Sequence, residues 1–463
     1  MPAAVFRHEL RELFRLAVPL AAAQAGSQLM GLVDVAVLGR YGARELAAAG
    51  LGNAFFFAFA IIGMGIVLGV DPLVSQAVGA GDHQGARRIF WQGIWLAIVI
   101  AGVLTAILLV ATLLLPAIGA EAELIDPAQT YLFIRIVSLL PHLLFYVARS
   151  YLQALGITRP LLVSMVIANV FNLFATVVLV FGGSVLPSWT GPLRVIPSLG
   201  IAGAAIATVL CTTLQLAIVA FAIRAIEVPG RVNHRWSSRE VAQAFRVGTP
   251  VGLQMGAEVG IFALVGVLAA RLGTMHLAAH NLVIALASFT FTVALGIAAA
   301  GSVRVGIGIG AGDRHATRSA GHAAFIGGIL VMGVAASLFA FMPRALARMV
   351  TDQEAVIATA IPLMLVAAVF QLSDGIQAVG AGVLRGAADT TYAFLANLIG
   401  HWFVGLPTAL YLGFYKEMGV VGLWWGLCAG LTVVAILLFI RFERRSAGLI
   451  APVGRQVSRD SVS

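Results

Sequence analysis

Twelve long apolar runs determine what this chain can fold into. A bilayer core about 30 Å thick is crossed by a helix of about 20 apolar residues, and each run reaches roughly that length before charge, glycine or proline ends it. We therefore expect twelve membrane spans, at residues 14–38, 46–71, 88–115, 131–155, 160–183, 200–224, 245–270, 276–300, 319–342, 357–383, 392–414 and 419–441.

The composition agrees with an all-α polytopic membrane protein. Hydrophobic residues make up 60% of the 463 residues and charged residues only 11%, whereas soluble domains carry about 25% charge. Cys211 and Cys428 both lie inside apolar runs, so we expect no disulfide between them. Soluble enzymes, disordered scaffolds and secreted disulfide frameworks are excluded.

The 29 Lys and Arg residues indicate the orientation. With both termini in the cytoplasm, the inner segments hold 20 of them and the outer loops hold 7, while Arg135 and Arg149 fall inside spans. This distribution favours cytoplasmic termini, because positive residues accumulate on the inner side of a membrane. The basic residues form no single stripe, so the net charge of +9 does not indicate a nucleic-acid partner.

An internal repeat relates the two halves of the chain. Residues 14–19 align with residues 245–250 at an offset of 231, and the same offset aligns the Gly-Ala-Gly-Asp motifs at 79–82 and 310–313. An even number of spans keeps both halves in one orientation, so a pseudo-two-fold axis along the membrane normal should relate two six-helix lobes. Parallel repeats of this kind are typical of secondary transporters.

This repeat divides the chain into four parts. We expect an N-terminal six-helix lobe at residues 1–223, a cytoplasmic inter-lobe linker at 224–244, a C-terminal six-helix lobe at 245–442 and a polar cytoplasmic tail at 443–463. The tail is poor in apolar residues after Arg445, so we expect it to be disordered.

Three acidic residues, Asp34, Glu258 and Asp374, lie well inside spans. An ionised side chain at the bilayer centre costs roughly 2.5 to 3.5 kcal/mol, so each should face a cavity, a cation or another polar group. The alternative is a protonated acid that hydrogen-bonds between helices and serves only packing. The offset places Asp34 opposite Val265 and Glu258 opposite Ser27, which predicts two different polar sites.

Neutral oxygen donors accompany these acids. Asn169, Asn172 and Thr176 lie in the fifth span and Thr208 in the sixth. Oxygen ligands with few charges suit a proton or a hard monovalent ion such as Na⁺.

Several other motifs have weaker functional interpretations. Gly306, Gly308 and Gly310 follow a membrane span, not a strand, so they favour close helix packing over phosphate binding. His276 and His280 have metal-ligand spacing but lack the glutamate of a zinc-protease motif. Three histidines could either form hydrogen bonds between helices or relay protons: His142, His322 and His401. Six phenylalanines could either face lipid or bind a flat cation by cation-π contact: Phe55, Phe56, Phe57, Phe59, Phe289 and Phe291.

No nucleophile and base pair supports an intramembrane hydrolase, so we expect neither enzymatic activity nor a cofactor.

Taken together, the motifs resemble those of the multidrug and toxic compound extrusion (MATE) family, and most of all its NorM branch. They comprise Met30–Asp34, the two Gly-Ala-Gly-Asp loops, Glu258, and Phe370–Asp374 leading into Gly380–Gly386. The resemblance implies two lobes around a central cleft that export small organic cations, such as drugs and dyes, in exchange for Na⁺ or H⁺. It also implies a lipid-embedded protein of the bacterial inner membrane, which we expect to be monomeric.

The resemblance further implies roles for individual residues. Asp34, Asn172 and Thr208 would form the cation or proton site of the first lobe, and Glu258 and Asp374 that of the second. Pro19 matches the proline at which the first span bends in the family. Supporting or substrate-lining roles would go to Asn169, Thr176, Phe370 and Gln371.

Two positions depart from the family pattern. Phe370 stands where NorM-like members often have tyrosine, and Thr176 where many members have Asp or Asn. The alternative function is a flippase of a lipid-linked precursor from the same superfamily. Such flippases usually add two spans and a basic central cavity, neither of which this sequence predicts.

Overall fold

A computed structural model describes residues 3–118, 121–230 and 232–453, and every regular element in these ranges is a helix. The N-half of the described chain contains α1 (Ala3–Tyr41), α2 (Ala43–Val67), α3 (Val70–Gly79), α4 (His83–Leu113), η1 (Leu115–Ile118), α5 (Ala122–Ile136), α6 (Leu139–Ala154), α7 (Arg159–Phe181), η2 (Gly183–Val185), η3 (Ser188–Val195) and α8 (Gly200–Arg224). The C-half contains α9 (Ser238–Arg271), α10 (Thr274–Gly310), α11 (Arg314–Phe341), α12 (Pro343–Arg348), α13 (Glu354–Gly386), α14 (Thr390–Leu398), η4 (Ile399–Gly405), α15 (Leu406–Leu410), η5 (Tyr411–Tyr415) and α16 (Gly419–Ser446).

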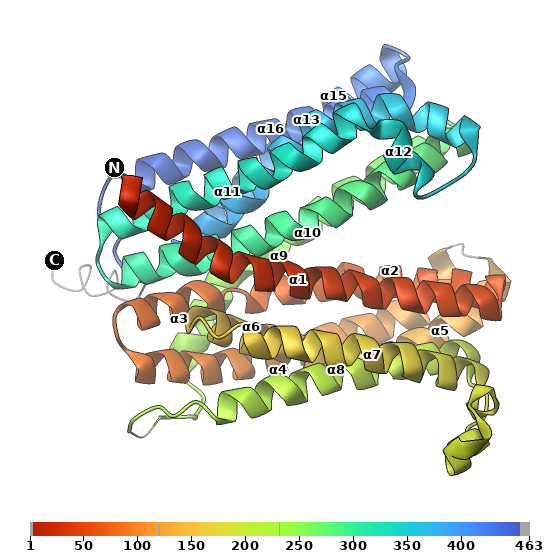
Figure 1. The fold of residues 1–463 in the computed structure, drawn as a ribbon, viewed down its shortest axis with the longest axis horizontal. Helices are drawn as coiled ribbons and strands as arrows, with labels where there is room; N and C mark the ends of the chain where they lie inside the picture. Colours follow the sequence, from red (N-terminus) through yellow and green to blue (C-terminus); the bar gives the residue numbers. More distant parts are fainter. Residues whose placement is uncertain (1–2, 119–120, 231, 454–463) are drawn as a thin grey trace.

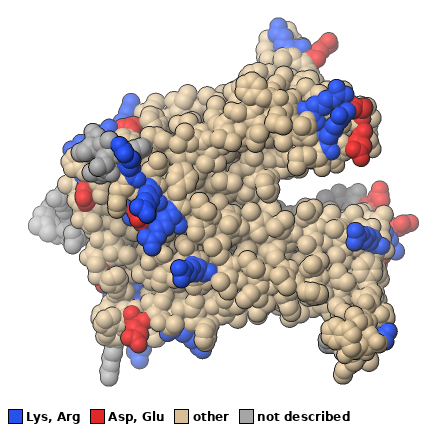
Figure 2. Space-filling model, in the orientation of Figure 1, with Lys and Arg blue, Asp and Glu red and all other residues tan. Residues whose placement is uncertain are grey.

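The described helices account for the expected spans. Eleven are long and apolar enough to cross a membrane, and the bent pair α5 and α6 makes a twelfth when it is counted as one span. The two helices of this pair meet at 43°, so the fourth predicted span is a broken helix. Figure 2 shows the charged side chains near the two ends of the molecule, with a broad uncharged band between them.

Helix α1 connects the two halves. A Cβ atom added at Gly327 of α11 would lie 3.2 Å from the side chain of Leu13, whereas one at Gly26 would overlap Met165 of α7. Figure 1 shows this red helix starting beside the upper bundle and ending in the lower one. Pro19 lies inside the helix between these two sets of contacts, and its role as a bend stays a prediction.

The apolar cores show where the halves are joined. The largest core contains buried residues of both halves, from Leu13 to Ile450. A second core, from Ile261 to Leu431, belongs to the C-half alone, and a third, from Val37 to Ala205, belongs to the N-half alone. The halves therefore share a core in one region and have separate cores elsewhere.

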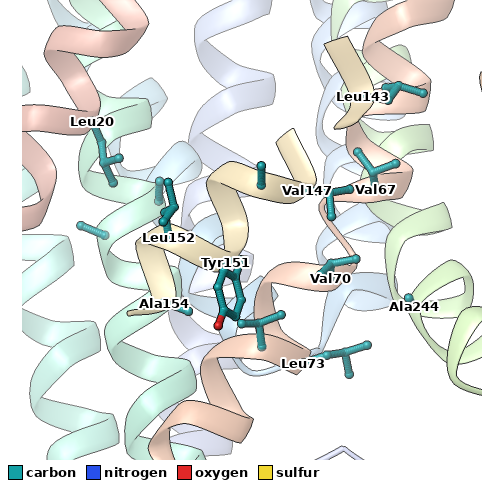
Figure 3. Close-up of a cluster of buried hydrophobic side chains, with 14 of the residues drawn as sticks. Leu20, Val67, Val70, Leu73, Leu143, Val147, Tyr151, Leu152, Ala154 and Ala244 are labelled. Atoms are coloured by element: carbon teal, nitrogen blue, oxygen red, sulfur yellow. The ribbon is translucent and has the colours of Figure 1, made fainter. Parts of the chain in front are cut away.

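Figure 3 shows part of the shared core, where Val147 of α6 lies beside Val67 and Val70, and Ala244 of α9 contributes from the other half. The space-filling view shows a cleft between the two bundles (Figure 2). It opens at the end of the molecule opposite the start of α1 and the end of α16 (Figure 1).

Backbone contacts between the halves follow the repeat. A Cβ atom at Gly79 would overlap the carbonyl oxygen of Ile307, and one at Gly310 would overlap the carbonyl oxygen of Gln76. The 231-residue offset converts the first pair into the second, because it maps 79 onto 310 and 76 onto 307. Reciprocal contacts of this kind are what a two-fold axis produces.

A second pair of contacts obeys the same rule. A Cβ atom at Gly65 would overlap the backbone of Gly252, and one at Gly296 would overlap the backbone of Ala21. The offset again maps 65 onto 296 and 21 onto 252. The structure thus confirms the parallel repeat that the sequence predicts.

Gln76 connects three parts of the chain at the end where the two halves are in contact, which we call the closed end. Its Nε2 donates to the carbonyl oxygen of Gly386 at 3.1 Å, and its Oε1 accepts from the backbone N–H of Val453 at 2.9 Å. Ile450 is buried in the shared core. The expectation of disorder after Arg445 is therefore wrong for residues 447–453, because apolar burial and a backbone hydrogen bond hold them.

Two further expectations concern the ends of the predicted domains. Residues 454–463 of the tail and Arg231 of the linker lie outside the described residues. Helix α9 begins at Ser238, within the segment predicted as the linker. The domain limits otherwise stay a prediction.

We predict that Gly310→Ala separates the halves at the closed end, because the added methyl group overlaps the Gln76 carbonyl oxygen. The measurement is the rate of maleimide labelling of Ser75→Cys, which replaces a side chain only 1% exposed. Labelling should be faster with Gly310→Ala and unchanged with Gly102→Ala, whose Cβ would meet no atom within 4 Å. Equal rates in both variants would contradict the prediction.

Candidate functional site

Asp34 lies at the centre of a polar cluster in the N-half. Its Oδ1 accepts hydrogen bonds from Asn172 Nδ2 and Thr176 Oγ1, both at 3.1 Å, and its Oδ2 accepts one from Thr208 Oγ1 at 3.2 Å. Three helices, α1, α7 and α8, supply these side chains. The structure therefore brings together Asp34, Asn172 and Thr208, as the family resemblance implies, and places Thr176, for which a supporting role was expected, in the same cluster.

The spacing along α7 explains this geometry. Asn172 and Thr176 are four residues apart, so they lie on one face of the helix, and both are completely buried. The amide oxygen Oδ1 of Asn172 is buried and has no hydrogen-bond partner among the described residues. A buried acceptor without a donor is costly, and a cation or a proton donor beside it would remove that cost.

Glu258 lies at the centre of the corresponding cluster in the C-half. Its Oε2 accepts hydrogen bonds from Gln377 Nε2 at 3.3 Å and from Asn397 Nδ2 at 3.4 Å. Asp374 is 4% exposed and interacts electrostatically with Glu258. Helices α9, α13 and α14 supply these groups. That the two predicted acids of this half act as one ion site stays a prediction.

The C-half cluster also contains unpaired oxygen atoms. Gln377 Oε1 and Asn397 Oδ1 are buried without a hydrogen-bond partner in the part of the chain that the structure describes. Together with the two carboxylates, these amides supply oxygen atoms that could bind a cation. The contacts described for this cluster include no positively charged group. Such a set suits a proton or a hard monovalent cation.

The other predicted residues lie apart from these contacts. Asn169 donates to the carbonyl oxygen of Met165 at 2.9 Å, and Gln371 donates to Thr290 Oγ1 at 2.5 Å. The Phe370 ring is 2% exposed and packs 5.3 Å from the ring of Trp424. These three side chains therefore have packing partners of their own, and their supporting or substrate-lining role stays a prediction.

Sequence reasoning missed Gln377 and Asn397. Gln377 follows Asp374 by three residues, a spacing that places both on one helix face. Asn397 and His401 are polar residues four positions apart in an apolar span, and His401 is buried with both ring nitrogens unpaired among the described residues. Polar residues at helical spacing beside a known acid are the signal that would have found them.

The weaker motifs have structural explanations. The described residues contain no group of three or more His, Cys, Asp or Glu side chains that could hold a metal ion, and His280 packs against Trp424. A Cβ atom at Gly306 would overlap Ser75, and one at Gly308 would overlap Thr317. The glycine motif therefore serves close helix packing, as expected.

One family model matches the chain twice. The MatE family model matches residues 19–178 and again residues 250–411. The two matches begin 231 residues apart, which is the offset of the reciprocal contacts between the halves.

The chain belongs to the MatE family.

Curated relatives of this MatE chain are similar over nearly their whole length. It is 33% identical over 457 residues to the probable multidrug resistance protein NorM of Pseudomonas putida, covering 96% of each chain. It is 35% identical over 444 residues to the protein of the same name from Deinococcus radiodurans, covering 95% of this chain and 96% of that one.

Solved structures share the fold. A crystal structure of MATE in complex with MaD3S matches with a TM-score of 0.85 at 19% identity, covering 95% of this chain and 97% of that one. A eukaryotic MATE transporter matches with a TM-score of 0.82 at 19% identity, covering 96% and 98%. The all-helical architecture of this MatE chain is therefore that of known membrane transporters.

If the Asp34 cluster binds a cation, we predict that Asn172→Ala weakens that binding by about 10- to 100-fold, because a hydrogen bond to a charged group contributes about 1.5–3 kcal/mol. The measurement is the ion concentration that gives half-maximal dye efflux in membrane vesicles. Asn169→Ala is the matched control, since its amide bonds within its own helix. A larger effect at position 169 than at position 172 would contradict the assignment.

Proposed function

We propose that this MatE protein is a cation-coupled multidrug efflux antiporter, which exports small organic cations in exchange for Na⁺ or H⁺ by alternating access. The observation that carries this proposal is the pair of separate acidic clusters, one inside each half of a two-fold scaffold. The curated relatives are named as multidrug resistance proteins, which supports the export of several drugs. The family resemblance supplies the expectation that these drugs are organic cations. We further propose that it acts as a monomer in the bacterial inner membrane, with both termini in the cytoplasm.

The clusters have the chemistry that ion coupling needs. Asp34, Glu258 and Asp374 are acids within spans, where an uncompensated charge is unfavourable. Both clusters also contain buried amide oxygens that have no donor among the described residues, one in the N-half at Asn172 and two in the C-half at Gln377 and Asn397. A proton or a Na⁺ ion would neutralise the acids. A Na⁺ ion would also be coordinated by these amide oxygens.

The arrangement of the halves supports alternating access. They share a core and backbone contacts at the end near the termini, and a cleft separates them at the other end (Figure 2). With cytoplasmic termini this is an outward-open arrangement. Ions arriving from outside would bind the acids and shift the population toward the opposite state, provided that the two states differ in their affinity for the ion.

The flippase alternative finds less support. A lipid-linked pyrophosphate is an anion and needs a basic cavity, whereas the polar cluster of the C-half holds two acids. The described residues also form only eleven or twelve spans, whereas such flippases usually have two more than twelve.

We predict that Asp34→Asn, Glu258→Gln and Asp374→Asn each abolish dye efflux while the protein stays in the membrane at normal levels, because the neutral amide cannot exchange a cation. Efflux of a fluorescent organic cation from whole cells is the measurement. Asp82→Asn is the control, since asparagine can still cap helix α4 as Asp82 does through the Gly85 N–H. Near-normal efflux by all three variants would refute carboxylate exchange.

A second test concerns the coupling ion, for which we predict Na⁺. The two acids of the C-half lie beside neutral amide oxygens, and a Na⁺ ion uses such oxygens as ligands, whereas a proton needs only one acceptor. Proteoliposomes loaded with an organic cation dye, with Na⁺ and pH gradients imposed separately, should export the dye under the Na⁺ gradient alone. Efflux that survives Na⁺ removal and collapses with a protonophore would show that H⁺ is the ion.

A further inference from the structure

The first helix of each half is held by an ion pair to the other half. Glu9 of α1 pairs with Arg304 of α10 at 2.6 Å, and Glu240 of α9 pairs with Arg88 of α4 at 2.9 Å. The 231-residue offset maps position 9 onto position 240, whereas it places Ser319 opposite Arg88. Two glutamates at equivalent positions of the repeat thus bind arginines of opposite halves, and each arginine comes from a position of its own.

The contacts with the opposite half continue along both helices to equivalent residues. The backbone of Ala21 contacts α10, and the backbone of Gly252 contacts α2. Figure 1 shows the start of α1 beside the upper bundle, which contains α10 and α11. We call residues 9–21 and 240–252 the crossed segments, because each belongs to one half by sequence and packs against the other.

Beyond its crossed segment each helix returns to its own half. In α1, a Cβ atom at Gly26 would overlap Met165 of α7, and Asp34 accepts hydrogen bonds from α7 and α8. In α9, Ile261 and Val265 are buried in the core that belongs to the C-half alone. Both first helices therefore pass from one half to the other.

A proline lies near the end of each crossed segment, at the equivalent positions Pro19 and Pro250. A proline inside a helix removes one backbone hydrogen bond, so the helix bends there more easily than elsewhere. The crossed segment can therefore keep its contacts while the rest of the same helix moves with its own half.

Other contacts at the closed end join the two halves without a crossed segment. Asp71 of α3 lies 3.5 Å from the Nε atom of Arg385 of α13. A Cβ atom at Gly306 of α10 would overlap the side chain of Ser75 of α3. A motion that opens the closed end must separate these residues, because each belongs to the same half by sequence and by packing.

We propose that the crossed segments stay bound to the opposite half throughout the transport cycle, with the ion pairs Glu9–Arg304 and Glu240–Arg88 as permanent anchors. The two bodies that move then differ from the two halves of the sequence, because they have exchanged their first helical segments. This inference rests on the proposed function, since it is the alternating-access cycle that opens the closed end.

The burial of the first anchor supports its permanence. The side chain of Glu9 is 11% exposed and that of Arg304 is 22% exposed. Separating a buried ion pair leaves uncompensated charges, which is strongly unfavourable. A contact that is present in both states stabilises both equally, so its removal shifts no equilibrium between them. Anchors and latches therefore respond differently to substitution.

The first test compares two disulfides that both end on α10. A Cβ atom at Gly296 would lie 2.7 Å from the Cβ of Ala21, and one at Gly306 would lie 2.6 Å from the Cβ of Ser75. Both pairs are close enough for a disulfide, which joins Cβ atoms about 3.8 Å apart. Ala21→Cys/Gly296→Cys fixes the crossed segment of α1, and Ser75→Cys/Gly306→Cys is the matched control that fixes α3.

Both double variants are made in the full-length chain with Cys211→Ala and Cys428→Ala, which remove the two native thiols. The measurement is ion-driven efflux of an organic cation dye from proteoliposomes, before and after reduction. We expect the oxidised crossed-segment pair to export dye as fast as its reduced form. The oxidised control pair should lose efflux and regain it on reduction.

A second measurement needs no cysteine on α1. The rate of maleimide labelling of Ser75→Cys, in the same background, reports opening of the closed end. We expect Asp71→Asn to raise this rate by at least about tenfold, because it breaks a buried pair that holds one state. Glu9→Gln should leave the rate unchanged, as should the control Glu12→Gln, whose carboxylate pairs with Arg15 of the same helix.

The outcomes are distinct. Efflux that is lost when the Ala21 and Gly296 positions are joined and returns on reduction would overturn the proposal. Labelling that Glu9→Gln accelerates as much as Asp71→Asn would also overturn it, because the ion pair would then be a latch that opens in each cycle. The proposed function fails separately, if the unsubstituted protein shows no dye efflux driven by an ion gradient.

Discussion

Close contact of the two halves at one end is the constraint on which the rest of this structure depends. At Gly79 and Gly310 the backbone of one half lies where any larger residue would place its Cβ atom. Because both contacts obey the repeat, they lie symmetrically about the axis that relates the halves. A cleft at the opposite end, and any rocking of one half against the other, require this close and symmetric contact.

The repeat gives the two halves similar helix bundles, but it does not give them the same polar cluster. Asp34 has no acidic counterpart in the C-half, and Glu258 has none in the N-half, so each half acquired its polar cluster at different positions of a similar bundle. The cost of a charge in the membrane explains why both clusters contain amides as well as acids, and why the N-half cluster also contains hydroxyls.

Much of this was predictable from the residues. Length and hydropathy predict the spans, and self-comparison predicts the axis, which the contacts of Gly65 and Gly296 confirm. The cluster of Asp34 with Asn172 and Thr208 was also predictable, but only through the resemblance to a family. Periodicity places a residue on one face of its own helix, but it does not show which other helix packs against that face. For the same reason Asn397 was missed. The break between α5 and α6 was also missed, although Pro141 marks it. A proline at this position cannot donate a hydrogen bond to the carbonyl oxygen of Val137.

The hydrogen bonds of Gln76 have a consequence for how the protein is made. Its two partners lie 310 and 377 residues further along the chain, so both hydrogen bonds can form only after Val453 has been synthesised. The closed end is therefore completed only after helices of both halves have been made, when residues 447–453 can reach Gln76.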